Sequence, residues 1–113
     1  MDRTVAAFSA LLEEFTQDKW GGTVGAIEAL NEPAGYQDDV LAVTNQYWQT
    51  TYNALRDLRI RRGTDKDPNE IKMVIMDGFR GVEHYEGFLT PPNAEGVLMD
   101  TASVSSRRLD LSY

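Results

Sequence analysis

Apolar residues near the start of the chain recur at steps of three and four positions. They are Val5, Phe8, Leu11, Leu12 and Phe15. Because a helix turns once in about 3.6 residues, this spacing gathers them on one face and predicts an amphipathic helix over residues 4–15. Asp2 stands where the N-cap of that helix is expected.

The next apolar stretch is continuous instead of periodic. Residues 24–30 read Val-Gly-Ala-Ile-Glu-Ala-Leu, and Pro33 follows shortly afterwards. A short apolar run of this kind is typical of a strand that is buried on both faces, as the strands of parallel sheets are. We therefore predict a doubly buried strand here that Pro33 ends.

Helical spacing returns at position 38 or 39 and runs through Leu55, with Arg56 near its end. Acidic residues in the first turn and a basic residue near the last favour a helix, because they complement its dipole. Its apolar face is aromatic, and Trp48 and Tyr52 are predicted core residues. The polar residues 61–69 then predict an exposed loop.

The rest of the chain continues the alternation of helices and strands. The remaining predictions are a strand over 71–76, a short helix over 82–89, a turn over 90–93 and a strand over 97–99. This order predicts the α/β class, with consecutive units that form a parallel sheet. Functional residues in such folds gather at the carboxyl ends of the strands.

Composition narrows the possible functions. The 113 residues and 42% hydrophobic content predict one globular domain at most. A net charge of −7 would repel a phosphate backbone, so no nucleic acid partner is expected. The chain has no apolar run long enough for a membrane span, no signal peptide pattern at its start and no cysteine. His84 is its one histidine, and we expect neither a metal nor a cofactor.

Asn31-Glu32-Pro33 lies at the end of the first predicted strand, where a side chain can reach a cleft. If extended geometry continues through Glu32, then Glu28 shares its face and is a buried carboxylate that needs a partner. A carboxyl group partly shielded from water is suited to donate a proton. By itself the tripeptide also fits an ordinary strand end, so the residues alone leave both interpretations open.

The segment around Glu32 is more specific than the tripeptide. Residues 25–33, Gly-Ala-Ile-Glu-Ala-Leu-Asn-Glu-Pro, resemble the fourth-strand segment of glycoside hydrolase family 5, most closely its fungal exo-1,3-β-glucanases. The resemblance continues through residues 46–56, 74–79 and 96–101. It implies a partial (β/α)8 barrel with three parallel strands, the fourth to the sixth, in which residues 4–15 are the third barrel helix.

This resemblance implies roles for several residues. Glu32 would be the acid/base of a retaining β-glycosidase, with β-1,3-glucan as substrate and an extracellular or cell-wall location for the whole enzyme. Phe79 would lie near the sugar subsites, with simple packing as the alternative. Asn31 and Asp77 are candidate substrate-binding residues, although Asp77 before Gly78 also suits a turn.

Two departures from the family indicate a fragment. The family pattern requires a His and a Tyr after Asp100-Thr101, whereas residues 102–113 read as an unrelated tail that follows a catalytic piece at 1–101. The nucleophilic Glu belongs to the seventh strand, and no residue here takes its place. Since a closed (β/α)8 barrel needs roughly 250 residues, we expect this chain to be inactive alone and prone to self-association.

Two alternatives remain at this level. The tripeptide is shared across family 5, so a β-1,4-endoglucanase is possible in place of a β-1,3-glucanase. A noncatalytic α/β module that binds carbohydrate or a protein is the alternative from another class.

Overall fold

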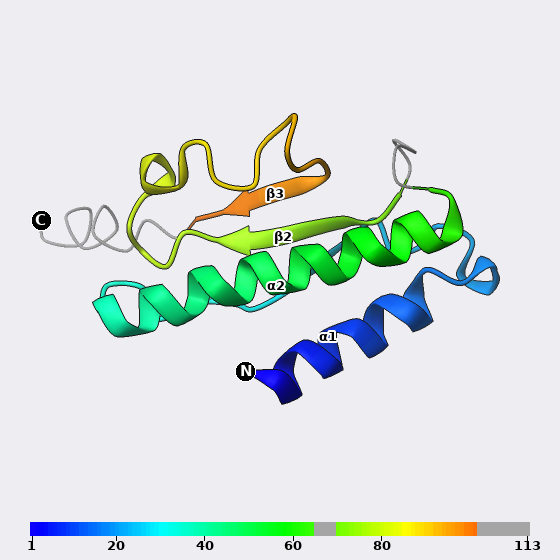
Figure 1. Ribbon diagram of the computed structural model, residues 1–113, viewed down its shortest axis with the longest axis horizontal. Coiled ribbons are helices and arrows are strands. Elements are labelled where there is room, and N and C mark those ends of the chain that lie inside the picture. Colours follow the sequence, from blue (N-terminus) through cyan, green and yellow to red (C-terminus); the bar gives the residue numbers. More distant parts are fainter. Residues whose placement is uncertain (65–69, 102–113) are drawn as a thin grey trace, which may run out of the picture.

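The computed structural model describes residues 1–64 and 70–101, so most of the predicted loop at 61–69 and the predicted tail lie outside the described residues. The elements are α1 (Asp2–Phe15), η1 (Asp18–Trp20), β1 (Ala26–Glu28), α2 (Asp38–Arg62), β2 (Lys72–Met76), η2 (Val82–Tyr85) and β3 (Val97–Asp100). The strands form one parallel sheet in the order β1-β2-β3, which confirms the predicted α/β class (Figure 1). These residues form an open sheet and not a closed barrel.

The first helix packs through the predicted face but begins earlier than expected. Phe8 and Leu12 are buried, whereas Leu11 is exposed. The prediction of Asp2 as the N-cap is wrong, because Met1 occupies that position and Asp2 lies in the first turn. Its negative charge still complements the positive end of the helix dipole.

Helix α2 continues into residues predicted to form a loop. It ends at Arg62, where Gly63 adopts a left-handed conformation with φ 73°. The last turns of α2, beyond Arg56, contact both the sheet and α1. Arg59 is buried against the sheet, and Arg62 pairs with Glu13 of α1 at 3.2 Å. Leu58, three residues after Leu55, is also buried, so the apolar face and the arginine contacts together extend the helix to Arg62.

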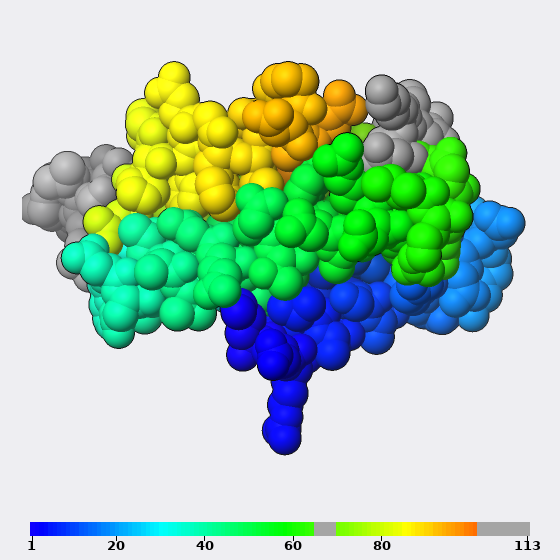
Figure 2. Space-filling model, in the orientation of Figure 1, coloured from blue at the N-terminus to red at the C-terminus, as the bar shows by residue number. Residues whose placement is uncertain are grey.

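The helices cover one face of the sheet. Figure 2 shows α2 lying across the middle of the molecule, with α1 along one side and the connection between β2 and β3 along the other. Trp48 and Leu55 of α2 pack with Met73 and Ile75 of β2 at the centre of the core, and each has at most 1% exposure. Tyr52 is also buried, so the predicted core positions in α2 are confirmed.

The other face of the sheet is open, and this corrects the prediction for the first strand. Strand β1 has three residues, with Ile27 partly buried and both Ala26 and Glu28 exposed. The predicted burial on both faces is wrong, because no described element packs over that side. Strands β2 and β3 fall within one residue of their predicted ends.

A buried arginine fixes the amino ends of the strands. Arg59 donates hydrogen bonds to the carbonyl oxygens of Ile71 and Glu95, the second at 3.2 Å. Its guanidinium lies over Gly96, where an added Cβ would stand 2.8 Å from Nη2. Since Gly96 also has φ 73°, a larger residue would strain the backbone and displace the arginine.

The helix predicted over residues 82–89 is shorter in the structure. It is reduced to the 3-10 turn η2, which is followed by the predicted turn near Pro92. Trp20 keeps 38% of its surface exposed and packs on Phe15 with ring centroids 5.4 Å apart. In residues 1–64 and 70–101, no helix combines the length and the apolar composition that crossing a membrane requires.

Candidate functional site

The loops that follow β1 and β2 meet at the carboxyl end of the sheet. Their backbones approach so closely at Gly35 and Gly78 that a Cβ added to Gly35 would lie 2.6 Å from the carbonyl oxygen of Gly78. Arg80 strengthens the contact by donating to the Gly35 carbonyl at 2.5 Å and to an Asp38 carboxylate oxygen at 2.7 Å. The loop that carries Glu32 is therefore held by backbone packing and hydrogen bonds.

Glu32 is exposed at this carboxyl end, but not in the predicted conformation. Strand β1 stops at Glu28, and Glu32 itself has a left-handed backbone with φ 49°. The assumption of extended geometry through Glu32 is therefore wrong. A turn, and not strand alternation, brings the Glu32 carboxylate close enough to repel Glu28 electrostatically.

Glu28 lies on the open face and has a carboxyl partner. The residue was predicted to be buried, yet it is exposed. Partial burial of its carboxyl group raises its pKa, and repulsion from Asp100, a hydrogen bond with Asp100 and repulsion from Glu32 raise the pKa further. Asp100 was missed as a functional candidate, although its position at the end of the third predicted strand could have indicated it.

Asp77 is almost fully buried and serves its own turn. Its carboxylate accepts hydrogen bonds from the backbone N–H groups of Phe79 and Gly81 at 3.1 and 3.0 Å, and from the Thr101 hydroxyl at 2.6 Å. Both oxygens are engaged within the chain. This geometry fits the interpretation of Asp77 as a turn former better than a direct contact with a sugar.

Phe79 forms one half of an aromatic pair at the same end of the sheet. Its ring lies 6.2 Å from that of Tyr36, at an interplanar angle of 52°. Tyr36 is 64% exposed, and Asn31 is exposed nearby in sequence on the same loop. Tyr36 was not predicted as a site residue, although an aromatic residue three positions after Pro33 was a usable signal.

The described residues form no cluster of side chains that could bind a metal ion. His84 is exposed, and its ring packs against Tyr85 at 5.1 Å. Within residues 1–64 and 70–101, no group of three or more His, Asp or Glu side chains is arranged to hold a metal ion.

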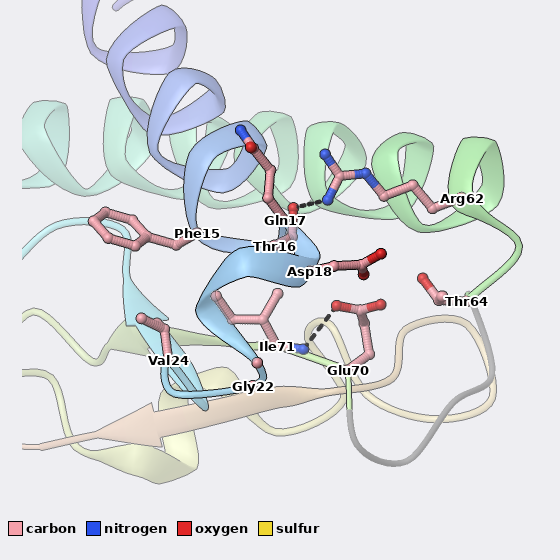
Figure 3. Close-up of a pocket in the computed structure, with 11 residues that line it drawn as sticks. Phe15, Thr16, Gln17, Asp18, Gly22, Val24, Arg62, Thr64, Glu70 and Ile71 are labelled. Carbon is pink, nitrogen blue, oxygen red and sulfur yellow. Dashed lines mark hydrogen bonds between the residues drawn. The ribbon is translucent and has the colours of Figure 1, made fainter.

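A hollow of about 690 Å³ lies at the opposite, amino end of the sheet. It is lined by Phe15, Val24, Arg62, Glu70 and neighbouring residues (Figure 3). Two of its polar side chains are engaged, since Arg62 donates to the Thr16 hydroxyl and Glu70 accepts the N–H of Ile71 at 3.0 Å. The candidate site residues lie away from this hollow, at the end where parallel sheets place their sites.

Comparison with known proteins gives partial matches. A probable glucan 1,3-beta-glucosidase A of Emericella nidulans is 33% identical over 104 residues, which make up 89% of this chain and 22% of that protein. A sporulation-specific glucan 1,3-beta-glucosidase of Saccharomyces cerevisiae is 31% identical over 101 residues, with 88% and 21% covered. A probable glucan 1,3-beta-glucosidase A of Aspergillus niger is 36% identical over 105 residues, with 89% and 21% covered.

Two other comparisons returned nothing. No family model matches the chain, and no solved structure matches it. The chain spans about a fifth of the length of the curated relatives that it matches. Over most of its own length, it is therefore similar to a stretch of glucan 1,3-beta-glucosidases.

Proposed function

We propose that this chain carries the acid/base carboxylate, Glu32, of a retaining hydrolase of β-1,3-glucan. The observation that carries the proposal is the exposed position of Glu32 beside the open sheet face, in a chain similar to proteins named glucan 1,3-beta-glucosidases. The resemblance of residues 25–33 extends the proposal to glycoside hydrolase family 5 and to a (β/α)8 barrel of which β1, β2 and β3 are the fourth to sixth strands. The whole enzyme would act outside the cell or at the cell wall.

The proposed chemistry is a double displacement. Glu32 protonates the glycosidic oxygen while a second carboxylate, about 5 Å away, attacks the anomeric carbon. Glu32 then removes a proton from the water that releases the sugar. The resemblance assigns the nucleophile to a seventh barrel strand outside the matched segments, so the 113 residues by themselves should not hydrolyse glucan. Residues 1–101 would be a piece of the catalytic barrel, and residues 102–113 lie outside the described residues.

The aromatic pair supports a sugar at this position. A glucose ring has one apolar face, and an exposed aromatic ring can bury that face from water. Tyr36 presents such a ring four residues after Glu32, and Phe79 supports it from the next loop. Asn31 would bond a sugar hydroxyl, whereas Asp77 would hold the Phe79 turn in place.

A chimaera tests the proposal. Residues 1–101 would replace the matching stretch of the Emericella nidulans relative, and the product would be assayed on laminarin by proton NMR. We expect glucose with retained β-configuration. Glu32→Gln should lower the rate on laminarin by roughly 10²- to 10⁴-fold, the usual cost of losing a general acid. Aryl glycosides with good leaving groups should lose less in the glycosylation step.

The outcomes separate the alternatives. Glu95→Gln, an exposed control at the opposite, amino end of β3, should leave the rate unchanged. Release of the α-anomer would rule out the retaining mechanism, and preference for β-1,4-glucan would favour the endoglucanase alternative. A folded chimaera that binds laminarin without cleaving it would favour a noncatalytic module.

A further inference from the structure

A buried carboxylate fixes the turn that follows β2, over residues 77–81. The Asp77 side chain accepts the backbone N–H groups of Phe79 and Gly81 at 3.1 and 3.0 Å. Phe79 has a left-handed backbone with φ 67°, which a residue other than glycine keeps only where its surroundings hold it there. Because both N–H groups bond to one carboxylate, Asp77 sets the shape of this segment, which we call the Asp77 turn.

One side of the Asp77 turn is attached to the end of β3. Thr101, the residue after β3, donates its hydroxyl to Oδ2 of Asp77 at 2.6 Å. The backbone N–H of Asp77 donates to the carbonyl oxygen of Asp100 at 3.2 Å. Since Gly81 bonds to the same carboxylate oxygen as Thr101, the end of β3 helps to place the far end of the turn.

The other side of the Asp77 turn is attached to the loop that carries Glu32. A Cβ added to Gly78 would lie 2.9 Å from Cα of Gly35, so the two backbones are in direct contact. Arg80 donates to the Gly35 carbonyl oxygen at 2.5 Å. Gly35 lies three residues after Glu32, which is exposed and has a left-handed backbone. The course of the loop beside Glu32 therefore follows the position of the turn.

We propose that the Asp77 turn positions the Glu32 loop, with Arg80 and Thr101 as positioning residues at its two attachments. A general acid must lie within hydrogen-bond reach of the oxygen that it protonates. A displacement of about 1 Å can lower a rate on the order of 100-fold. Arg80 and Thr101 act through the loop and the turn. Their effect on catalysis rests on the proposed function, whereas the attachment of the loop can be tested without any activity.

The chimaera with the Emericella nidulans relative tests the effect on catalysis. Arg80→Gln removes the guanidinium that bonds to Gly35, and its exposed ion pair with Asp38 contributes little. The kcat on laminarin should fall by roughly 10- to 100-fold with little change in KM. Aryl glycosides with good leaving groups depend less on the proton of Glu32, so they should lose less in the glycosylation step. Arg61→Gln, an exposed arginine near the far end of α2, is the control.

Two glycines provide a matched pair for the backbone contact. Neither Gly35 nor Gly25 has a left-handed backbone, so alanine brings no strain of that kind at either position. A Cβ on Gly35 would lie 2.6 Å from the carbonyl oxygen of Gly78, whereas one on Gly25 meets nothing within 4 Å. Gly35→Ala should therefore push the loop off the turn and reproduce the substrate-dependent loss. Gly25→Ala should leave both rates unchanged.

Hydrogen exchange of the 113-residue chain tests the attachment of the loop directly. The N–H groups of Gly35 and Gln37 donate within the loop, to the carbonyl oxygens of Pro33 and Ala34 at 2.7 and 3.0 Å. In Arg80→Gln, both should exchange faster by roughly fivefold, the effect expected from losing one hydrogen bond. Arg61→Gln should leave them unchanged.

The attachment to β3 has its own pair of variants. Thr101→Val keeps the shape of the side chain without its hydroxyl, so the N–H groups of Phe79 and Gly81 should exchange faster. Thr101→Ser keeps the hydroxyl and should exchange as the unchanged chain does. Unaltered exchange in Arg80→Gln and Thr101→Val would overturn the proposal, as would equal rate losses on laminarin and aryl glycosides. A chimaera without hydrolysis would refute the proposed function alone, since exchange still decides the attachment.

Discussion

The two faces of the sheet differ in what they contribute. On the helix-covered face, Met73 and Ile75 have at most 1% exposure beneath α2, whereas on the open face Leu98 is 50% exposed, on the same side as Glu28 and Asp100. Apolar burial is the main source of folding free energy, so the covered face stabilises the fold. The open face retains titratable groups in contact with water. The residues that stabilise the fold and those of the proposed site therefore lie on opposite sides of one sheet.

The largest expected difference in stability is between alanine substitutions of one leucine on each face of the sheet. Leu55 is fully buried in α2, so Leu55→Ala should cost about 2–5 kcal/mol through lost transfer energy and a new cavity. Leu98→Ala on the open face should change stability by less than about 0.5 kcal/mol. Urea unfolding followed by circular dichroism measures both. Equal losses for the two variants would show that the open face is covered in solution.

Two glycine substitutions measure what the buried Arg59 contributes to stability at the amino end of the sheet. Gly96→Ala should cost about 2–3 kcal/mol, because it combines left-handed strain with displacement of the buried Arg59 guanidinium. Gly22→Ala is the matched control, since Gly22 has φ 74° and nothing within 4 Å of an added Cβ. Thermal unfolding of both variants isolates the Arg59 contact. If the two cost the same, Arg59 contributes nothing beyond backbone strain.

Self-association of the chain tests whether the open face of the sheet is exposed in solution. Strands β1 and β3 form the edges of the described sheet, and Leu98 is an exposed residue of β3. We expect the 113-residue chain to associate, and Leu98→Lys to weaken association by about tenfold, equivalent to about 1.4 kcal/mol, because exposed charge discourages edge pairing. Sedimentation velocity over a dilution series measures it. A monomer at all concentrations, with strong amide protection, would contradict the expectation.

The smallest effect concerns the charges that join the two helices. A hydrogen bond from Arg61 holds the pKa of Glu13 below its usual range, and the charge of Arg62 adds to this. Since the folded-state pKa is lowered, the contribution is present at neutral pH and is lost as the pH falls through that value. Glu13→Gln should therefore destabilise the chain slightly at pH 7 and low salt. Adding 0.5 M NaCl should remove the difference, because exposed pairs are screened.

Much of the fold could be predicted because local patterns agree with it. Strands β2 and β3 are apolar runs with clear turn residues after them, and the aromatic stripe of α2 occupies the core as expected. The end of α2 could not be predicted in this way. Its last turn depends on Arg59, which the sequence presents as a polar residue and the structure buries against two carbonyl groups.

The sequence also indicated some residues of the candidate site and missed others. Asn31-Glu32-Pro33 at a strand end indicated Glu32, because a short motif is visible in one stretch of sequence. Tyr36 and Asp100 were missed, since each gains its meaning from a residue far away in the chain, Phe79 and Glu28 respectively. The exposure of Glu28 was also hidden, because periodicity shows which residues share a face but not what covers that face.

The sequence by itself determined the α/β class, the order of the elements and the core of α2, and it indicated Glu32 as the candidate acid/base. These features depend on periodicity and on residues next to one another in the chain, which a linear pattern records. Only the tertiary structure decided that one sheet face is open, that Asp77 is committed to its own turn and that Glu28 and Asp100 share the open face. Such contacts depend on strand register and on loop packing at Gly35 and Gly78, where side chains distant in sequence come together because the backbone brings them there.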